Sequence, residues 1–291
     1  MRFLKGHGTE NDFVILPDPD GALDLTAETV ARICDRRAGI GADGVLRVVR
    51  TKAAGEPAVE ALAGEAEWFM DYRNADGSIA EMCGNGTRVF ARYLVEAGLA
   101  SPGEWGLATR AGVRGISLGA TGDVSVDMGP PRLLGAGEAS VAGQAYQGRH
   151  VSMGNPHLAC RIDEPVAVLD LCRAPSFDPA AFPEGVNVEF YRPVGDHHVE
   201  MRVYERGSGE TRSCGTGTVA VAVAAAVGSA EPYDAYAMAG GKLPRGEWSV
   251  DIPGGRVTVT LDGRTSHLKG PAVIVAEGEL RADWLAAPTT R

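Results

Sequence analysis

Positive charge, long apolar runs and cysteine are all scarce in this sequence. Its 28 Lys and Arg residues are outnumbered by 38 Asp and Glu, which gives a net charge of −10 and a pI near 5.1. Because a nucleic-acid binder needs a basic surface to neutralise phosphates, we expect no nucleic-acid partner. The longest apolar run, 219–227, is far shorter than the roughly 20 residues that a membrane helix takes, so we expect no membrane partner.

The cysteines are few and widely spread. An odd number at such spacing argues against a disulfide framework and indicates a reducing compartment. The first residues, MRFLKGHGTENDF, contain no apolar stretch of the kind found in secretory signals, so we expect a cytoplasmic protein. No C-x-x-C pair occurs and His197–His198 is poor zinc geometry, so we expect no metal. The five cysteines are Cys34, Cys83, Cys160, Cys172 and Cys214.

The composition is that of a globular protein. Hydrophobic residues make up 44% and charged residues 23% of 291 residues, a chain long enough for two domains. Short runs alternate apolar and polar residues between Gly-rich turns, which predicts antiparallel hairpins with one buried face. Two segments, 51–67 and 232–247, have the pattern of hairpin or loop insertions. The strand-like runs lie at 12–16, 44–50, 67–73, 115–129, 198–205, 249–261 and 272–280.

Three helices are predicted. The first spans TAETVARICDRR, with Thr26 as its N-cap and an apolar face of Val30, Ile33 and Cys34. The other two, TRVFARYLVEAG and TVAVAVAAAVG, each follow a Cys-Gly motif and end on a glycine that suits a left-handed C-cap. The last helix is apolar on every side, which predicts burial all round, as inside a small barrel or strongly curved sheet.

The chain divides into two halves of similar content, with a boundary near residue 127 just before the Pro/Gly-rich GPPRLLGAGEA. When MCGNGTR is aligned on SCGTGTV, Cys83 falls on Cys214, and Asn74 falls on Glu205, each after a strand. This weak internal repeat predicts two related domains. We therefore expect an α+β fold of two pseudo-symmetric domains. Each would be a curved antiparallel sheet or barrel around a central helix, with the active site in the cleft between them.

Each Cys-Gly motif has the sequence of a helix N-terminus. Glycines let the backbone approach an anion, and the unpaired N–H groups and dipole of the helix favour negative charge, so each motif predicts a carboxylate or phosphate site. The same field can lower the pKa of a thiol at the mouth of the helix from ~8.5 to ~3.5–7.5. A single free cysteine is as often a small buried hydrophobic residue, so one motif alone decides nothing.

Two such motifs together indicate a reaction. Two thiols that share a cleft titrate together, because ionising one makes the second harder to ionise, and the pair rests as one thiolate and one thiol. A thiolate on one face of a carbon and a thiol on the other can remove a proton and return one from the opposite side. That reaction is racemisation or epimerisation. No segment has the character of a pyridoxal phosphate site, so we expect no cofactor.

Six motifs, in chain order, resemble those of diaminopimelate epimerases: KGHGTENDF, RRAGIGADG, YRNADGSIAEMCGNGTR, SMGNPH, GVNVEF and YERGSGETRSCGTGT. GPAVIVAEGEL is similar to the closing strand of that family. The resemblance implies a first domain of residues 1–127 plus 272–291 and a second of 128–271. It also implies interconversion of LL- and meso-2,6-diaminopimelate without pyridoxal phosphate, for lysine and peptidoglycan synthesis. A homodimer is suggested by the resemblance alone.

The resemblance also assigns residues. It makes Cys83 and Cys214 the acid/base pair and puts His157 and Glu205 near the reacting amine. A substrate with two carboxylates and two ammoniums needs donors for the first and acceptors for the second, and Arg206 is a natural bidentate clamp. The substrate-binding positions implied by the resemblance are Asn11, Asn74, Gly84, Asn85, Asn155, Asn187, Glu205, Arg206, Gly215 and Thr216.

Two positions depart from the family pattern. Glu10 stands where the family often has glycine, and Gly44 stands where many relatives carry a glutamine that reaches the ligand. We assign no role to Gly44. A closed, empty site could also bring the two sulfurs within bonding distance, so we predict reversible inactivation by a Cys83–Cys214 disulfide.

Other functions fit parts of the sequence. A proline or hydroxyproline racemase also has paired cysteine motifs, and SCGTGT alone fits it, but YRNADGS and YERGSGET favour the epimerase. A Cys–His hydrolase could use Cys83 or Cys214 with His157, yet it leaves one motif unexplained. An anion-binding or dinucleotide-binding module could use GIGADG, but this stretch follows a helix and precedes a strand, the reverse of the dinucleotide-binding order.

Overall fold

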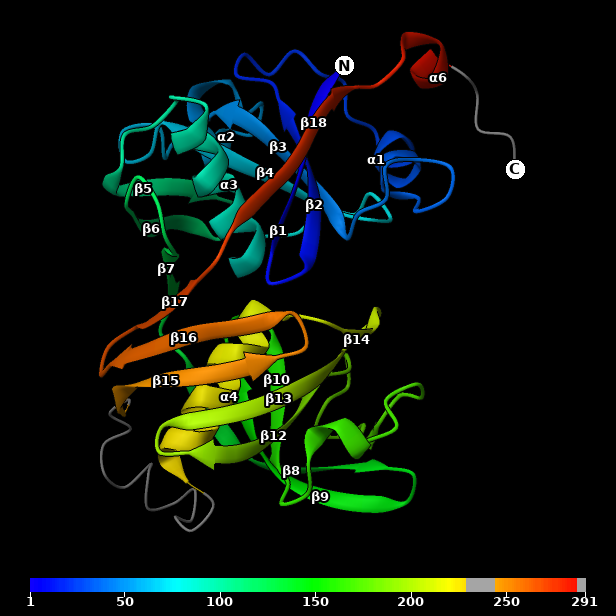
Figure 1. The fold of residues 1–291 in the computed structure, drawn as a ribbon, viewed down its shortest axis with the longest axis vertical. Coiled ribbons are helices and arrows are strands. Elements are labelled where there is room, and N and C mark those ends of the chain that lie inside the picture. The colour runs from blue at the N-terminus through cyan, green and yellow to red at the C-terminus, as the bar shows by residue number, and fades with distance from the viewer. Residues whose placement is uncertain (229–243, 287–291) are drawn as a thin grey trace. The chain divides into compact units, whose positions relative to one another are not determined.

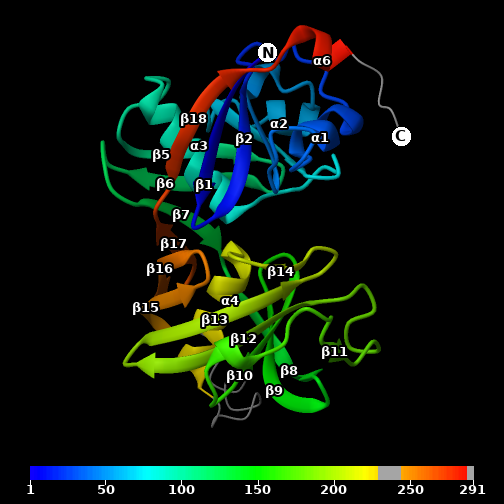
Figure 2. The same ribbon diagram turned by 45° about the vertical axis from the view of Figure 1, so that its right-hand side comes forward.

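The computed structural model describes residues 1–228 and 244–286. The chain forms two compact units, which we call unit 1 (Met1–Val124 together with the chain from Pro271 onward) and unit 2 (Ser125–Gly270). Figure 1 labels their helices and strands, and Figure 2 shows the same ribbon turned by 45°. Among the described residues, no helix has both the length and the apolar character needed to cross a membrane.

Unit 1 is a mixed sheet that packs against helix α3. Its strands lie in the order β18-β1-β2-β3-β4-β5-β6, and all neighbours are antiparallel except the parallel pairs β2–β3 and β4–β5. The strands are β1 (Arg2–Gly8), β2 (Asn11–Pro17), β3 (Gly44–Arg50), β4 (Trp68–Asn74), β5 (Gly103–Thr109), β6 (Gly112–Leu118) and β18 (Val273–Glu279). The helices are α1 (Ala27–Cys34), η1 (Thr51–Ala53), α2 (Pro57–Glu60), α3 (Gly84–Glu96) and α6 (Ala282–Ala286).

Unit 2 is a second mixed sheet, around helix α4. The order is β8-β9-β10-β12-β13-β15-β16-β17, with parallel pairs β10–β12 and β13–β15 and antiparallel pairs elsewhere. The strands are β7 (Val124–Gly129), β8 (Arg132–Val141), β9 (Gln144–Ser152), β10 (Pro156–Arg161), β11 (Ser176–Phe177), β12 (Asn187–Gly195), β13 (His198–Glu205), β14 (Gly209–Thr211), β15 (Arg245–Ile252), β16 (Gly255–Asp262) and β17 (Ser266–Gly270). The helices are η2 (Val166–Val168) and α4 (Gly215–Val227).

The two sheets repeat one topology. From β18 to β6 in unit 1 and from β8 to β16 in unit 2, the pairings run antiparallel, antiparallel, parallel, antiparallel, parallel, antiparallel. This confirms the predicted pseudo-symmetric α+β fold. The prediction of purely antiparallel sheets is wrong. Parallel neighbours need a crossover connection, and α1, α3 and α4 supply three of the four crossovers.

The helices agree with their sequence signals. Thr26 caps α1 by accepting a hydrogen bond from the Thr29 N–H at 3.1 Å. Helix α4 has nine buried residues, as its uniformly apolar sequence predicts. A glycine with positive φ ends each of the two long helices, Gly98 at 68° and Gly228 at 75°, a conformation that other residues rarely adopt.

Several strands of the structure were not predicted from the alternation of apolar and polar residues. The Pro/Gly-rich segment 129–139 enters a ten-residue strand, β8, and β1, β5, β9, β10 and β12 also lie outside the predicted runs. The segment 51–67, expected as a hairpin or loop, contains η1 and α2. Most of the expected insertion at 232–247 lies outside the described residues; from Arg245 onward the chain is in β15.

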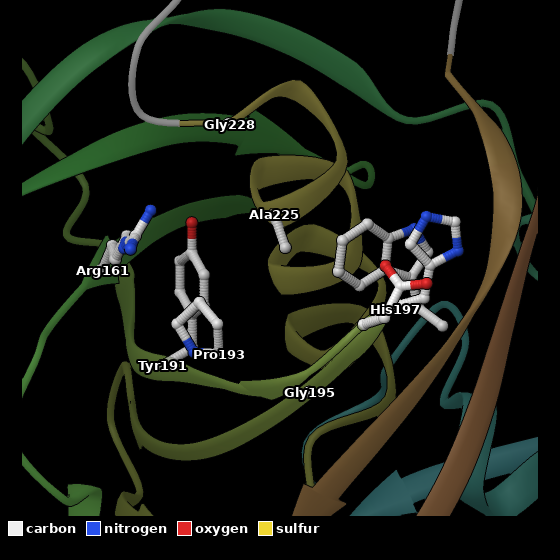
Figure 3. A pocket seen from close by; sticks show the side chains of 9 residues that line it. Arg161, Tyr191, Pro193, Gly195, His197, Ala225 and Gly228 are labelled. Carbon is white, nitrogen blue, oxygen red and sulfur yellow. The ribbon is translucent and has the colours of Figure 1, made fainter.

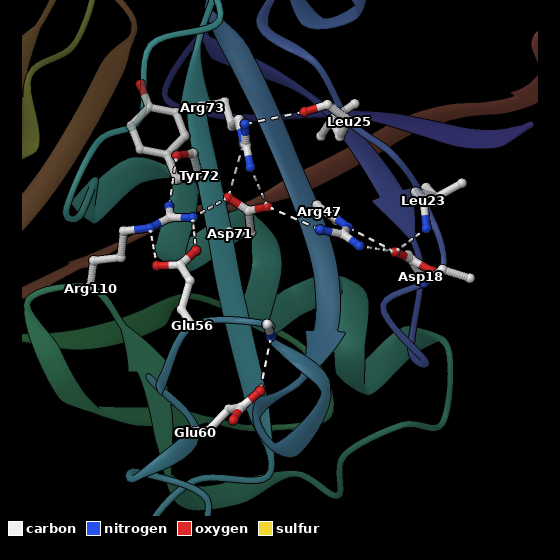
Figure 4. Close-up of polar contacts among 12 residues, drawn as sticks. Asp18, Leu23, Leu25, Arg47, Glu56, Glu60, Asp71, Tyr72, Arg73 and Arg110 are labelled. Atoms are coloured by element: carbon white, nitrogen blue, oxygen red, sulfur yellow. Dashed lines mark hydrogen bonds and ion pairs between the residues drawn. The ribbon is translucent and has the colours of Figure 1, made fainter. Parts of the chain in front are cut away.

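A buried ionic network ties β3 and β4 of unit 1 to the loops beside them (Figure 4). Asp71, 2% exposed, accepts hydrogen bonds from Arg73 at 3.1 Å and Arg110 at 2.6 Å, and Arg47 lies 3.5 Å away. Arg47 also donates to Asp18 at 2.7 Å. Burial alone would raise the pKa of Asp71, but the arginines lower it below the usual value for aspartate.

Candidate active site

Helix α3 begins immediately after Cys83, which occupies the N-cap position. The sulfur accepts a hydrogen bond from the Gly86 N–H at 3.4 Å, and the Thr87 hydroxyl donates to the Cys83 carbonyl at 2.9 Å. Serine and aspartate at an N-cap satisfy the free N–H groups of the first turn in the same way. The thiol of Cys83 is therefore held in the positive field of the helix terminus.

Helix α4 repeats this arrangement at Cys214. Its sulfur accepts from the Gly217 N–H at 3.4 Å, and the Thr218 hydroxyl donates to the Cys214 carbonyl at 2.7 Å. The Thr216 hydroxyl lies 3.6 Å from the sulfur. Cys214 is buried, at 6% exposure.

The chain reaches both cysteines by the same path. Arg73 in β4 pairs with Ile79, and Tyr204 in β13 pairs with Glu210, so each strand turns back on itself before the helix begins. Both pairs are offset by 131 residues, the same offset that separates Cys83 from Cys214. The internal repeat seen in the sequence is therefore a repeat of strand, return turn and cysteine-capped helix.

In unit 1 the structure brings Asn11, Cys83 and Asn85 together. The Asn11 Oδ1 lies 3.7 Å from the Cys83 sulfur and accepts from the Asn85 side-chain amide at 3.2 Å. The Asn11 Nδ2 donates to Asp43 at 2.7 Å. Asn74, at the end of β4, instead bonds Tyr72 and Ser78, each at 2.9 Å.

A buried arginine supports this group. Arg88 is fully buried and donates to Asn85 Oδ1 at 2.6 Å, Thr9 Oγ1 at 3.0 Å and the Pro271 carbonyl at 2.8 Å. Burial lowers the pKa of Arg88 to about 10, and the nearby Cys83 acts in the opposite direction. The guanidinium therefore stays protonated near neutral pH, within electrostatic reach of the Cys83 sulfur.

In unit 2 a chain of hydrogen bonds leads from a buried acid to Asn155. Glu189 Oε1 lies 2.6 Å from His157 Nδ1, and His157 Nε2 lies 3.1 Å from Asn155 Oδ1. Glu189 and His157 are both 0% exposed. Burial, with Glu205 nearby, raises the pKa of Glu189 although His157 acts to lower it.

Three other predicted residues of unit 2, Asn187, Glu205 and Arg206, lie at the C-terminal end of β13 or bond to it. Asn187 accepts from the Arg206 backbone N–H at 2.9 Å and donates to the Pro156 carbonyl at 3.1 Å. The Glu205 carboxylate accepts from the Thr211 hydroxyl. The exposed Arg206 guanidinium donates to the Glu184 carbonyl at 2.9 Å.

Burial of the sulfur raises the pKa of Cys214 well above its usual value, and Glu205 and Glu189 raise it further. These effects outweigh the bonds from Thr216 and the Gly217 N–H, which act to lower it. The expectation that the helix field lowers the thiol pKa is therefore wrong for Cys214. At neutral pH this residue is a thiol and can serve as a proton donor.

The structure shows neither a disulfide nor a metal-binding cluster within its described part. The five cysteines are all free thiols, and no cluster of three or more potential metal ligands occurs among the described residues. Figure 3 shows a pocket of unit 2 lined by Tyr191, His197, Ala225 and Trp248. It lies at the C-terminal end of α4, opposite to Cys214, and does not belong to the cysteine site.

The chain is similar to one protein family over most of its length. The family model for diaminopimelate epimerase matches residues 3–134 and 149–281. A diaminopimelate epimerase from Thermobifida fusca (strain YX) is 58% identical over 98% of this chain and all of its own length. The chain belongs to the diaminopimelate epimerase family. It is therefore an isomerase.

Solved structures share the fold at lower identity. A phenazine biosynthesis protein of the PhzF family from Bacillus anthracis aligns with a TM-score of 0.64 at 18% identity, covering 97% of this chain and 99% of its own. A hydroxyproline epimerase from Agrobacterium vitis gives 0.61 at 17%, covering 96% and 91%. These likenesses show the fold alone, whereas the sequence identity favours diaminopimelate epimerase over the racemase alternative.

Two residues beside the predicted epimerase site were missed. Glu189 lies within the quoted motif GVNVEF, and Arg88 directly follows CGNGT. The signal for Glu189 was an acid between the apolar residues Val188 and Phe190. For Arg88 it was a cation on a helix whose neighbours, Val89 and Phe90, are apolar. Either pattern marks a charge held inside the protein, where it needs partners.

Proposed function

We propose that this chain interconverts LL- and meso-2,6-diaminopimelate by a two-base mechanism, with Cys83 and Cys214 acting on opposite faces of one carbon. The observation that carries the proposal is the repeated N-cap, in which each sulfur accepts from the N–H three residues on, at 3.4 Å in both units. A mechanism with a single catalytic cysteine would not explain why the second cysteine occupies the same N-cap position.

The helix termini also suit the developing charge. As the α-proton leaves, negative charge spreads onto the adjacent carboxylate, and donors aimed at it stabilise the transition state. We assign this carboxylate to the backbone at Gly84, Asn85, Gly215 and Thr216. The remaining polar groups of the substrate are assigned to Asn11, Asn74, Asn155, Asn187 and Arg206, with His157 and Glu205 near the reacting amine.

We propose a starting role for each sulfur from its surroundings. Cys214, whose pKa is raised, begins as the thiol and donates a proton. Cys83, which lies near the buried guanidinium of Arg88, is assigned the part of the base that removes the proton. After turnover the roles are exchanged, so the reverse reaction starts from the opposite state.

Proton exchange in D₂O tests the mechanism. LL-diaminopimelate is incubated with the wild-type enzyme, Cys83→Ala and Cys214→Ala, and deuterium at the α-carbon is followed by NMR. Two opposed bases predict that early meso product carries deuterium while recovered LL substrate does not, and that each variant loses inversion. Equal labelling of substrate and product, with one cysteine dispensable, would contradict the proposal. Proline should be inert as a substrate.

The cellular setting is also a proposal. We infer a cytoplasmic homodimer whose two epimerase domains comprise residues 1–127 plus 272–291 and 128–271, and which needs no pyridoxal phosphate. Light scattering during gel filtration measures the assembly. Treatment with a carbonyl-trapping hydroxylamine reagent should leave activity unchanged; inactivation that pyridoxal phosphate reverses would contradict the cofactor-free mechanism.

A further inference from the structure

A buried His–Glu pair lies beneath α4 where unit 1 has apolar side chains. Phe13 faces Gly44 across β2–β3, and His157 faces Asn187 across β10–β12, so Phe13 and His157 hold equivalent positions. By the same register, Leu46 is equivalent to Glu189. Each pair lies at the same level of its own sheet.

Both pairs lie close to the first turn of the helix. A Cβ on Gly86 would lie 3.1 Å from Leu46 and 3.4 Å from Phe13, whereas a Cβ on Gly217 would lie 2.6 Å from Glu189 Oε1. An apolar pair therefore suffices to pack such a turn. The polar pair of unit 2 is not required for packing.

Burying the polar pair carries a cost. Glu189 and His157 are 0% exposed, and Glu189 Oε2 has no hydrogen-bond partner within the described part of the chain. A buried polar atom without a partner destabilises the fold. Because packing alone does not require this acid, its burial is a reason to look for a role in function.

Glu189 Oε1 and His157 Nδ1 lie 2.6 Å apart and share one hydrogen, which either atom can carry. The protonation of this pair determines which atom of the Asn155 side chain faces away from His157. With Glu189 protonated, its O–H donates to His157 Nδ1, and His157 carries its own hydrogen on Nε2. With the proton moved to the imidazole, Nε2 still carries a hydrogen. In both states Nε2–H donates to Asn155 Oδ1, the contact of 3.1 Å, and the Asn155 amide nitrogen is left to donate elsewhere.

We propose that Glu189 is a positioning residue, which through His157 fixes the Asn155 side chain so that its amide nitrogen donates to an anionic group of the substrate. This inference rests on the proposed function, because it takes Asn155 as a substrate-binding residue. Glu189 does not touch the reacting atoms. Its effect is on substrate binding and on the pH at which binding fails.

When the Glu189–His157 pair loses its shared proton, the side-chain amide of Asn155 must turn over. When Glu189 is ionised and His157 is neutral, Nδ1–H donates to the carboxylate and Nε2 is left as an acceptor. Asn155 must then turn its nitrogen inward and present its oxygen to the substrate, which repels an anion. KM therefore rises with pH once the pair loses its proton.

Several other titratable groups face this pair. Glu205 from β13 and Cys214 from the α4 N-cap interact with Glu189, as does Cys160 from β10, and His150 from β9 interacts with His157. An ionised Glu205 favours the protonated pair. Protonated His150 or a Cys214 thiolate would shift the pair in opposite directions, so the KM profile must be compared with a variant that lacks only the Glu189 charge.

Three variants test the proposal on the full-length enzyme. In Glu189→Gln the amide can donate to Nδ1 as the protonated acid does, so KM for LL-diaminopimelate at pH 7 should stay within about twofold and its rise at high pH should disappear. Glu189→Leu leaves Nδ1 without its partner, and KM should rise about tenfold, the loss of one hydrogen bond to a charged group, with a smaller change in kcat. The exposed Glu138→Gln, in β8 of the same unit, is the control and should match wild type.

The double variant His157→Phe/Glu189→Leu copies the apolar pair of unit 1. It should be at least as stable to heat as Glu189→Leu but keep the raised KM. Recovery of the wild-type KM in this variant would show that the pair only packs the helix, and would overturn the proposal. So would an unchanged KM in Glu189→Leu.

A substrate-free measurement separates this proposal from the proposed function. In the wild type, ¹⁵N NMR of His157 should show a protonated Nε2 near neutral pH, and Glu189→Leu should lose the fixed state. A bare Nε2 in the wild type would overturn the positioning role even if epimerase activity is found. Absence of epimerase activity in the wild type, with the NMR result as expected, would instead count against the proposed function.

Discussion

Units 1 and 2 place the same cysteine cap in opposite chemical surroundings. Behind Cys83 lies the buried cation Arg88, whose counterpart in unit 2 by the 131-residue offset is Val219. Behind Cys214 lies the buried acid Glu189, whose counterpart in unit 1 is Leu46. Positive charge thus adjoins one sulfur, and a carboxyl group adjoins the other.

This difference shows how two units with the same backbone can hold two thiols of unequal acidity. The repeated backbone gives each thiol the same N–H donors, which alone would give the two sulfurs equal acidity. A two-base reaction needs one thiolate and one thiol at rest. The deeper burial of Cys214 and the side chains that differ between the units supply this inequality, while the strand order and caps stay the same.

The largest effect is expected from the ionic network of unit 1. Asp71 in β4 and Arg202 in β13 hold equivalent positions with opposite charge, and Arg202 binds the Val166 and Leu169 carbonyls at 2.8 and 2.7 Å. Asp71→Asn leaves the buried arginines without their negative partner and replaces one acceptor oxygen by an N–H donor, which should cost about 3–5 kcal/mol. Arg202→Met should cost about 1–3 kcal/mol.

Guanidinium unfolding of both variants measures these costs. Asp20→Asn, at a side chain 84% exposed, is the control and should change stability by less than about 0.5 kcal/mol. Equal losses in Asp71→Asn and Arg202→Met would contradict the view that unit 1 depends more on buried charge.

Acid should weaken the ion pairs of Asp12 in unit 1. Burial acts to raise the pKa of Asp12, but the bonds from Arg36 and Lys5 outweigh it and lower the pKa from 3.8 to about 2. A depressed carboxyl pKa stabilises the fold above pH 3.8, and this stability is lost as the pH falls toward 2. Unit 2 has Pro156 at the equivalent position, which cannot titrate.

Asp12→Asn measures this term. It should lower the unfolding free energy by about 2 kcal/mol at pH 7, and the difference from wild type should shrink as the pH approaches 2. Urea unfolding at several pH values gives the difference directly. A constant difference from pH 7 to 2 would mean that the carboxylate charge is not the cause.

The two glycines beneath the caps should differ in their tolerance of alanine. At Gly86 the added methyl meets the ends of two apolar side chains at 3.1 and 3.4 Å, and a gain in helix propensity of at most about 1 kcal/mol offsets part of the crowding. At Gly217 the methyl would lie 2.6 Å from Glu189 Oε1, so Gly217→Ala should cost about 1–2 kcal/mol net.

A double-mutant cycle identifies the neighbour responsible. In a Glu189→Ala background, Gly217→Ala should lose most of its cost, as measured by thermal unfolding, because the crowding atom is gone. An undiminished cost would assign the strain to the backbone of the turn and not to Glu189.

The smallest effect is a difference in thiol reactivity. The thiolate is the reactive form, and the raised pKa and the burial of Cys214 both slow its alkylation, so iodoacetamide at pH 7 should label Cys214 at least about tenfold more slowly than the half-buried Cys83. Glu205→Gln should accelerate labelling of Cys214 because it removes one cause of the raised pKa. Peptide mass mapping follows each site, with buried Cys160 as an unreactive reference. Preferential labelling of Cys214 in the wild type would reverse the assignment of resting states.

The sequence predicted the parts of the molecule that depend on local chemistry. Thr26, Cys83 and Cys214 were recognisable as helix starts because a cap is determined by a few adjacent residues. The strand β12 and its parallel partner β10 were not recognised. A parallel pairing depends on residues 30 positions apart, and no turn between them announces it.

The buried pair of unit 2 was hidden for the same reason. His157 was predicted as a site residue by resemblance, but its partner Glu189 could be identified only once the register of β10 on β12 was known. The role of Arg88 could likewise be identified only from its hydrogen bonds to Thr9 and Pro271, which are 79 and 183 residues away in the sequence. Single-residue patterns show that a charge is unusual, whereas its partners come from tertiary structure.

The pairing of β18 with β1 has a consequence for synthesis of the chain. Arg2 pairs with Glu279 and Leu4 with Glu277, so one edge of β1 acquires its partner only after residues 273–279 have been translated. Until then this edge of unit 1 is an open template for other strands. Unit 2, which is continuous in sequence from Ser125 to Gly270, leaves the ribosome complete before unit 1 can close its sheet. Unit 2 can therefore fold before unit 1 although it is translated second, and a chain cut short before Val273 contains all of unit 2 and a unit 1 whose β1 edge is unpaired.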